Sequence, residues 1–191
     1  MSAPVVSESQ SARLRVLGVD PGTRVVGWAV LEPQVRGVWR VASGIWRLGG
    51  SETALPLRLH RLCIALSETL RVHAPVRVAL ESAFFGRNAR SALRIGEARG
   101  VVMMAAAAAG LPVEEIPPAT VKRRIAGAGA ATKEQVERLV RVHLGQPDLQ
   151  FDSADESDAV AVALCSLLAV AGPPPARRGR AVLPAGARIQ A

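Results

Sequence analysis

The stretch that decides the fold is residues 14–23, which read LRVLGVDPGT. Residues 14–19 are mostly apolar, Asp20 ends this segment, and Pro-Gly-Thr follows as a turn signal. This pattern predicts a short apolar strand with an acidic residue at its carboxyl end. Asp20 is therefore the first candidate for a functional carboxylate.

Working outward, the next segments predict a sheet with interspersed helices. Two more strands are expected at residues 25–31 and 38–48, close enough to form an antiparallel meander. Leucines then recur at steps of three and four, which predicts an amphipathic helix. Later elements are expected as a strand at 76–81, a helix at 88–109, a strand at 113–116 and a short helix from Pro118, followed by two more helices.

Capping signals mark where the last two helices begin. Thr132 and Gln135 form a capping box, and Asp152 or Ser153 caps the final helix. The order of elements predicts an α/β fold, with a mixed five-stranded sheet and helices on both faces. We expect residues 1–12 to be a flexible leader, 13–171 the folded domain and 172–191 a flexible basic tail.

The composition narrows the class of protein. The chain has 191 residues, 49% of them apolar, which is enough for one domain with a packed core. No apolar run is long enough to span a bilayer and the first residues lack a signal-peptide core, so we expect a cytoplasmic protein. The formal charge of +8 favours a polyanionic partner, although Arg-rich chains also come from Arg-rich proteomes.

Glu81 repeats the pattern seen at Asp20. It ends the apolar run VALE at residues 78–81. If the two strands are neighbours, the two carboxylates project at the same edge of the sheet. They would repel each other unless a cation lies between them.

Asp155 and Asp158 supply the third contribution. They are three residues apart at the start of the last helix, so they share one face. Acids in a first turn also stabilise a helix without any other function. Together with Asp20 and Glu81, however, they make an all-oxygen cluster of the kind that selects Mg²⁺ or Mn²⁺. Two such ions, roughly 3.5–4 Å apart, can assist in-line displacement at a phosphodiester.

Three motifs resemble those of RuvC-type Holliday junction resolvases. Residues 17–23 (LGVDPGT) with 26–28 (VGW) resemble the first motif, 80–88 (LESAFFGRN) the second, and 155–159 (DESDA) the third, D-x-x-D-A. The resemblance extends from Leu14 to about Leu168. Ser82 departs from it, because relatives often carry Gln at that position.

The resemblance implies an RNase H-like fold and a homodimeric endonuclease. Such an enzyme resolves four-way DNA junctions in recombination and repair, by symmetric nicks in two strands of like polarity. Asp20, Glu81, Asp155 and Asp158 match the catalytic, metal-binding acids, with two Mg²⁺ or Mn²⁺ ions per active site. The RuvA–RuvB branch-migration complex is the implied protein partner. We place the dimer surface on the small-residue face of residues 88–109.

The same resemblance predicts DNA contacts. Phe84 matches the aromatic residue that stacks on a base at the junction centre, with Phe85 as a rival and core packing as the alternative. Arg87 follows in the same motif. Lys122 and Lys133 match basic contacts near the active site. Lys133 begins its helix, where a cation opposes the helix dipole, and this suggests a use other than local stability.

Parts of the sequence also suggest three other functions. The Asp-Pro-Gly-Thr turn also resembles a phosphate loop of sugar kinases and actin-like ATPases, but those enzymes need two such halves. A catalytically inactive junction- or RNA-binding relative would be signalled by loss of an acid, and all four are present. An RNase H-like nuclease acting on RNA is disfavoured by the second motif.

Overall fold

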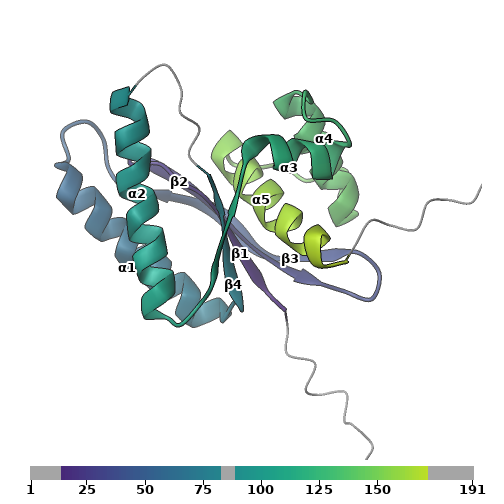
Figure 1. The fold of residues 1–191 in the computed structure, drawn as a ribbon, viewed down its shortest axis with the longest axis horizontal. Coiled ribbons are helices and arrows are strands. Elements are labelled where there is room, and N and C mark those ends of the chain that lie inside the picture. The colour runs from purple at the N-terminus through teal and green to yellow at the C-terminus, as the bar shows by residue number, and fades with distance from the viewer. Residues whose placement is uncertain (1–13, 83–88, 172–191) are drawn as a thin grey trace, which may run out of the picture.

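A computed structural model of the chain describes residues 14–82 and 89–171 (Figure 1). The described elements follow the predicted order, and their bounds are β1 (Val16–Asp20), β2 (Val25–Pro33), β3 (Val38–Arg47), α1 (Leu55–His73), β4 (Arg77–Glu81), α2 (Ala89–Ala108), β5 (Val113–Ile116), α3 (Pro118–Ala126), α4 (Lys133–Leu144) and α5 (Ala154–Ala171). The predicted leader and tail lie outside the described residues. Within those residues, no helix combines the length and apolar character needed to cross a membrane.

The five strands form one mixed sheet in the order β3-β2-β1-β4-β5. β1, β2 and β3 pair antiparallel, as predicted for the meander. β1 and β4 pair parallel, and so do β4 and β5. The first strand is therefore central, and the strand that carries Glu81 is its direct neighbour.

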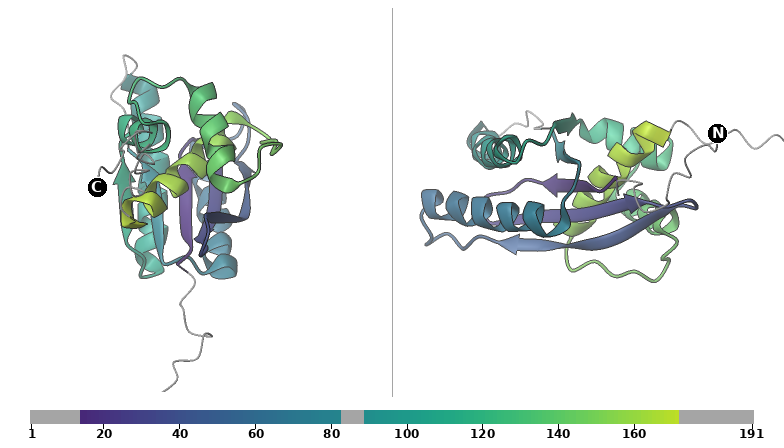
Figure 2. Two further views of the ribbon diagram at one scale, coloured as in Figure 1. Left: turned by 90° about the vertical axis from the view of Figure 1, so that its right-hand side faces the viewer. Right: turned by 90° about the horizontal axis from the view of Figure 1, so that it is seen from below.

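Helices cover both faces of the sheet, as predicted (Figures 1 and 2). On one face, Leu17 and Val19 of β1 pack with buried side chains of α1 and α2. On the other face, Val16 packs with α3, α4 and α5. Alternate residues of a strand point to opposite faces, so Gly18 and Asp20 lie on the α5 side with Val16.

Two glycines let α5 lie directly on the sheet. A Cβ added at Gly18 in β1 would overlap the carbonyl oxygen of Ala159, and one added at Gly27 in β2 would overlap the carbonyl oxygen of Asp155. Glycine in a strand interior often marks such a close backbone approach. The first two turns of α5 are thereby brought against the carboxyl end of β1.

Both predicted caps are present. The Thr132 hydroxyl accepts from the Gln135 amide, and the Gln135 side chain accepts from the Thr132 amide, which completes the capping box of α4. Ser153, rather than Asp152, caps α5, because its hydroxyl accepts from the amide of Glu156 at 3.2 Å. These caps fix where α4 and α5 begin, and thus where Lys133, Asp155 and Asp158 lie.

Candidate active site

Asp20 and Glu81 end adjacent parallel strands. In the register of β1 and β4, Val19 pairs with Leu80, so the next residues of both strands lie side by side. Both side chains point to the α5 face, because Gly18 and Ala79, two residues earlier, pair in the row beneath α5. The predicted adjacency of these two carboxylates is confirmed.

The environment of Asp20 strongly favours its protonated form in the absence of metal. Burial, followed by the nearby charges of Glu81, Asp158 and Asp155, raises the pKa of Asp20 to about 8. The pKa of Glu81 is raised as well, first by burial and then by Asp158. The charges of Asp155 and Asp158 thus act on Asp20, and that of Asp158 acts on Glu81.

Asp155 and Asp158 come from the first two turns of α5. Both are partly exposed, whereas Glu156 and Ser157 between them are buried. The contact of the Asp155 backbone with Gly27 places this turn of α5 over β2, next to the end of β1. The pair therefore completes a cluster of carboxylates from β1, β4 and α5.

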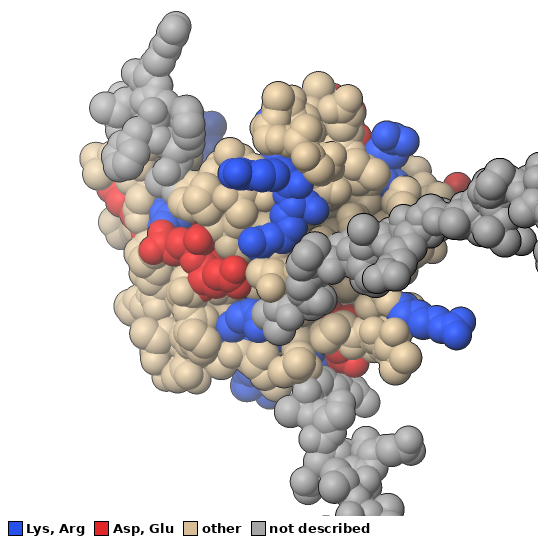
Figure 3. All heavy atoms as spheres, turned by 45° about the vertical axis from the view of Figure 1, so that its right-hand side comes forward, with Lys and Arg blue, Asp and Glu red and all other residues tan. Residues whose placement is uncertain are grey.

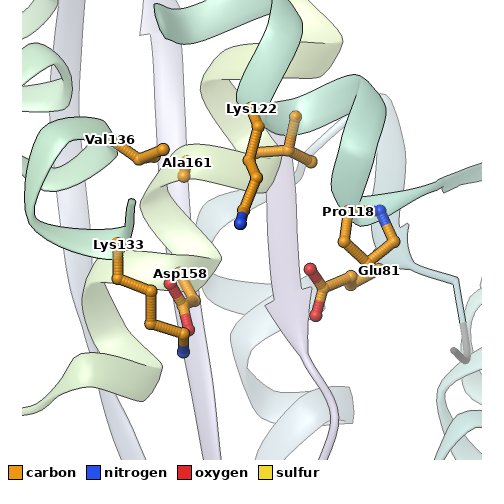
Figure 4. Close-up of a pocket in the computed structure, with 8 residues that line it drawn as sticks. Glu81, Pro118, Lys122, Lys133, Val136, Asp158 and Ala161 are labelled. Carbon is orange, nitrogen blue, oxygen red and sulfur yellow. The ribbon is translucent and has the colours of Figure 1, made fainter. Parts of the chain in front are cut away.

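A cleft of about 280 Å³ opens beside the cluster. Its lining residues are Glu81, Pro118, Val121, Lys122, Lys133, Val136, Asp158 and Ala161. In Figure 4, Glu81 and Asp158 lie on opposite sides, and the amino end of Lys122 points into the space between them. The cleft therefore joins two of the acids to both lysines of the chain.

Lys133 contacts the acidic cluster directly. Its Nζ donates to Asp158 Oδ2 at 2.6 Å. This hydrogen bond is the largest cause of the raised pKa of Lys133, and the charges of Asp158, Asp20 and Glu81 contribute. This partner in α5 accounts for the unusual place of a lysine at the start of a helix.

On one side of the molecule, charges of both signs adjoin. Figure 3 brings forward the side of the molecule that carries α3 to α5, and there Lys and Arg side chains gather beside a group of Asp and Glu. The two lysines that line the cleft beside Glu81 and Asp158 suit a phosphodiester substrate, since they offset its backbone charge.

Sequence reasoning missed Arg99 of α2. Its buried guanidinium donates to the backbone oxygen of Glu81 and to the carboxylate of Glu115 in β5. It thereby ties the end of β4 to β5 from the face opposite α5. Gly18 and Gly27 were missed in the same way, although glycine inside an apolar strand was an available signal.

The described residues also set limits on the site. As their side chains stand, no three Asp, Glu, His or Cys residues of 14–82 and 89–171 are arranged to surround a metal ion. Phe84 and Arg87, the predicted DNA contacts, lie outside the described residues.

Known proteins are similar to this chain in sequence and in fold. The family model described as crossover junction endodeoxyribonuclease RuvC matches residues 16–166. The chain belongs to the RuvC family. The RuvC of Myxococcus xanthus is 45% identical over 174 residues, covering 90% of this chain and 85% of the relative. The RuvC of Gluconobacter oxydans is 42% identical over 152 residues, covering 80% and 89%.

Solved RuvC structures support the same assignment. The structure of Thermus thermophilus RuvC in complex with a Holliday junction substrate superposes with a TM-score of 0.76 at 31% identity, covering 82% of this chain and 94% of that one. The fold is therefore RNase H-like, as expected. As a RuvC-family member, the chain is a crossover junction endodeoxyribonuclease that resolves Holliday junctions, and its family is metal-dependent.

Proposed function

We propose that Asp20, Glu81, Asp155 and Asp158 hold two Mg²⁺ or Mn²⁺ ions, with which this RuvC nicks two strands of like polarity symmetrically in a four-way junction. The observation that carries the proposal is the convergence of these carboxylates from β1, β4 and α5 beside a cleft that holds both lysines. Bound ions would polarise the phosphodiester and the attacking water.

The donor set fits hard divalent cations. The four groups offer only carboxylate oxygens, which Mg²⁺ and Mn²⁺ prefer. The raised pKa of Asp20 has burial and neighbouring negative charge as its causes, and a cation among the acids would oppose both effects. As their side chains stand, no three of the described acids are arranged to bind one metal ion. Metal binding therefore requires rotation of these side chains, and Asp158 must break its hydrogen bond with Lys133.

The two lysines of the cleft have separate roles in this proposal. Lys133 offsets the charge of Asp158 without metal, and once released its ammonium can pair with a DNA phosphate. Lys122 points between Glu81 and Asp158, where it can hold a phosphate oxygen over the acids (Figure 4). Phe84 and Arg87 remain predicted contacts to the junction, on the strength of the motif alone.

Symmetric nicking calls for two active sites, and we propose a homodimer to supply them. On α2, Leu93, Gly96, Gly100 and Met104 are exposed at spacings that put them on one face. An exposed apolar face of this kind is typical of a surface that binds protein. The RuvA–RuvB branch-migration complex is proposed as a further partner from the family resemblance.

The deciding experiment compares a synthetic four-way junction with linear duplex, in Mg²⁺ or Mn²⁺, for the native chain and Asp20→Asn. We expect paired nicks in the junction by the native chain and at least ~100-fold slower nicking by Asp20→Asn, because the loss of a ligand disables the ions. Junction binding, measured by gel shift in the presence of Ca²⁺, should persist in the variant. Equal nicking by both proteins would refute the assignment of Asp20.

A further inference from the structure

Glu156 lies between two of the acids assigned above, yet its side chain turns away from them. It is buried, with 4% of its surface exposed, whereas Asp155 and Asp158 on either side are partly exposed. A buried carboxylate is costly unless hydrogen bonds satisfy it. The partners of Glu156 therefore indicate what this residue does.

Both carboxylate oxygens of Glu156 are engaged. Oε2 accepts from the backbone amide of Asp152 at 2.7 Å, just before α5 begins. Oε1 accepts from the hydroxyl of Ser43 in β3 at 2.5 Å. One oxygen thus holds the start of the helix, and the other holds a strand 113 residues away in sequence.

Arg40 of β3 completes the contact. Its Nη1 donates to Ser43 Oγ at 2.8 Å and lies 3.9 Å from Glu156 Oε1. Residues three apart in a regular strand point to opposite faces. Here Val30 pairs with Ala42 and Leu31 with Arg40, so Val41 is an extra residue that bulges the strand. The bulge brings Arg40 and Ser43 to the same face, toward α5.

The row of residues across the sheet connects this contact to the active site. Ser43 pairs with Ala29 of β2, Ala29 pairs with Gly18 of β1, and Gly18 lies two residues before Asp20. α5 crosses the same row, held by Glu156 over β3 and by the contact of Ala159 with Gly18 over β1. The axial position of α5 relative to β1 is fixed at both points.

We propose that Glu156 is a positioning residue. Through Ser43 and Arg40 it holds the start of α5 so that Asp155 and Asp158 can bind the same metal ions as Asp20 and Glu81. This inference rests on the proposed function of those four acids. Hydrogen bonds behind the ligands of a metal typically matter about 10–100-fold in metal affinity. Loss of the Glu156 contact should therefore weaken metal binding while the acids themselves remain.

The test measures Mn²⁺ binding to the DNA-free chain by electron paramagnetic resonance titration. We expect Glu156→Ala to raise the dissociation constant about 10–100-fold. Glu156→Gln should restore most of the affinity, because its amide oxygen can accept from Asp152 and its amide nitrogen can donate to Ser43. Ser43→Ala should fall between the two.

Two further variants separate the possible failures. Leu70→Ala removes buried apolar packing on the opposite face of the sheet, so it should lower thermal stability and leave Mn²⁺ affinity unchanged. Asp158→Asn should lose affinity as a ligand variant. If Asp158→Asn binds Mn²⁺ like the native chain, the proposed metal site is wrong. If Asp158→Asn loses binding but Glu156→Ala keeps it, or Glu156→Ala and Leu70→Ala weaken it equally, the positioning role is overturned.

Discussion

At the scale of single residues, Asp20 is placed to bind a metal ion, but its buried charge destabilises the metal-free fold. Burial and the neighbouring acids raise its pKa from 3.8 to about 8. The folded chain therefore binds this proton more tightly than the unfolded chain does. The contribution of Asp20 to metal-free stability is greatest at low pH and falls as the pH rises from about 4 toward about 8.

Asp20→Asn should accordingly stabilise the metal-free chain at pH 8. The substitution removes the buried charge, and we expect a gain of about 1–3 kcal/mol, or several degrees in Tm. The gain should shrink toward pH 5, where the native carboxyl is largely protonated. Thermal denaturation in EDTA at both pH values measures it. A variant less stable than the native chain at pH 8 would contradict the proposed repulsion.

Lys133 is expected to affect metal binding and catalysis in opposite directions. Its ammonium donates a hydrogen bond to Asp158 in the metal-free site, so it competes with a divalent cation for this carboxylate. We expect Lys133→Gln to bind Mn²⁺ about fivefold more tightly without DNA, since even ~1 kcal/mol of relieved competition has that effect. The same variant should nick junctions more slowly, because the phosphate loses a counter-charge. Tighter metal binding with slower nicking would distinguish this role from simple damage to the site.

At the scale of elements, the active site depends on how closely α5 approaches the sheet. Gly27 in β2 leaves room for the carbonyl oxygen of Asp155, which even a single methyl group would displace. α5 carries two of the four acids, so its displacement should affect both stability and chemistry. Gly44 in β3 offers a contrast, because a Cβ there would meet its nearest atom, Trp28 Nε1, at 3.6 Å.

Gly27→Ala should therefore destabilise the fold by about 1–3 kcal/mol, as overpacking does, and slow junction nicking under conditions where the chain stays folded. Gly44→Ala makes the same chemical change in the neighbouring strand and should leave stability unchanged or slightly higher. Urea denaturation and nicking rates measure both effects. Equal behaviour of the two variants would show that the approach of α5 at Gly27 is not limiting.

At the scale of the whole molecule, the proposed dimer is tested on the exposed face of α2. Apart from the adjoining residues and backbone of α2 itself, a Cβ at Gly96 or Gly100 would meet nothing within 4 Å, so a side chain is tolerated there in the single chain. Arginine is also a better helix former than glycine, by up to ~1 kcal/mol. Any loss of association in Gly100→Arg would therefore come from the contact between copies.

We expect sedimentation velocity to give dimers for the native chain and monomers for Gly100→Arg. Val142→Arg, at an exposed position of α4, adds the same group elsewhere and should remain dimeric. Junctions should then receive paired nicks from the control and only single, uncoupled nicks from Gly100→Arg. Intact dimers in Gly100→Arg would place the dimer surface elsewhere.

The sequence by itself determined the order of the elements, the capping box of α4, and the acids at the ends of β1 and β4, and it narrowed the cap of α5 to Asp152 or Ser153. These features depend on periodicity, turn residues and capping groups within a few positions, so local pattern suffices to predict them. The three motifs also carried the family, because they lie in order along most of the chain.

Only the tertiary structure decided how these parts meet. Three interactions join residues that are distant in sequence. They are the hydrogen bond of Lys133 with Asp158, the close approach of Asp155 to Gly27, and the hydrogen bond of Ser43 with Glu156. The contact of Glu156 further depends on a bulge at Val41, which is defined by pairing with β2. Such contacts follow from how α4 and α5 pack on the sheet, and packing between distant segments leaves no periodic mark in either segment.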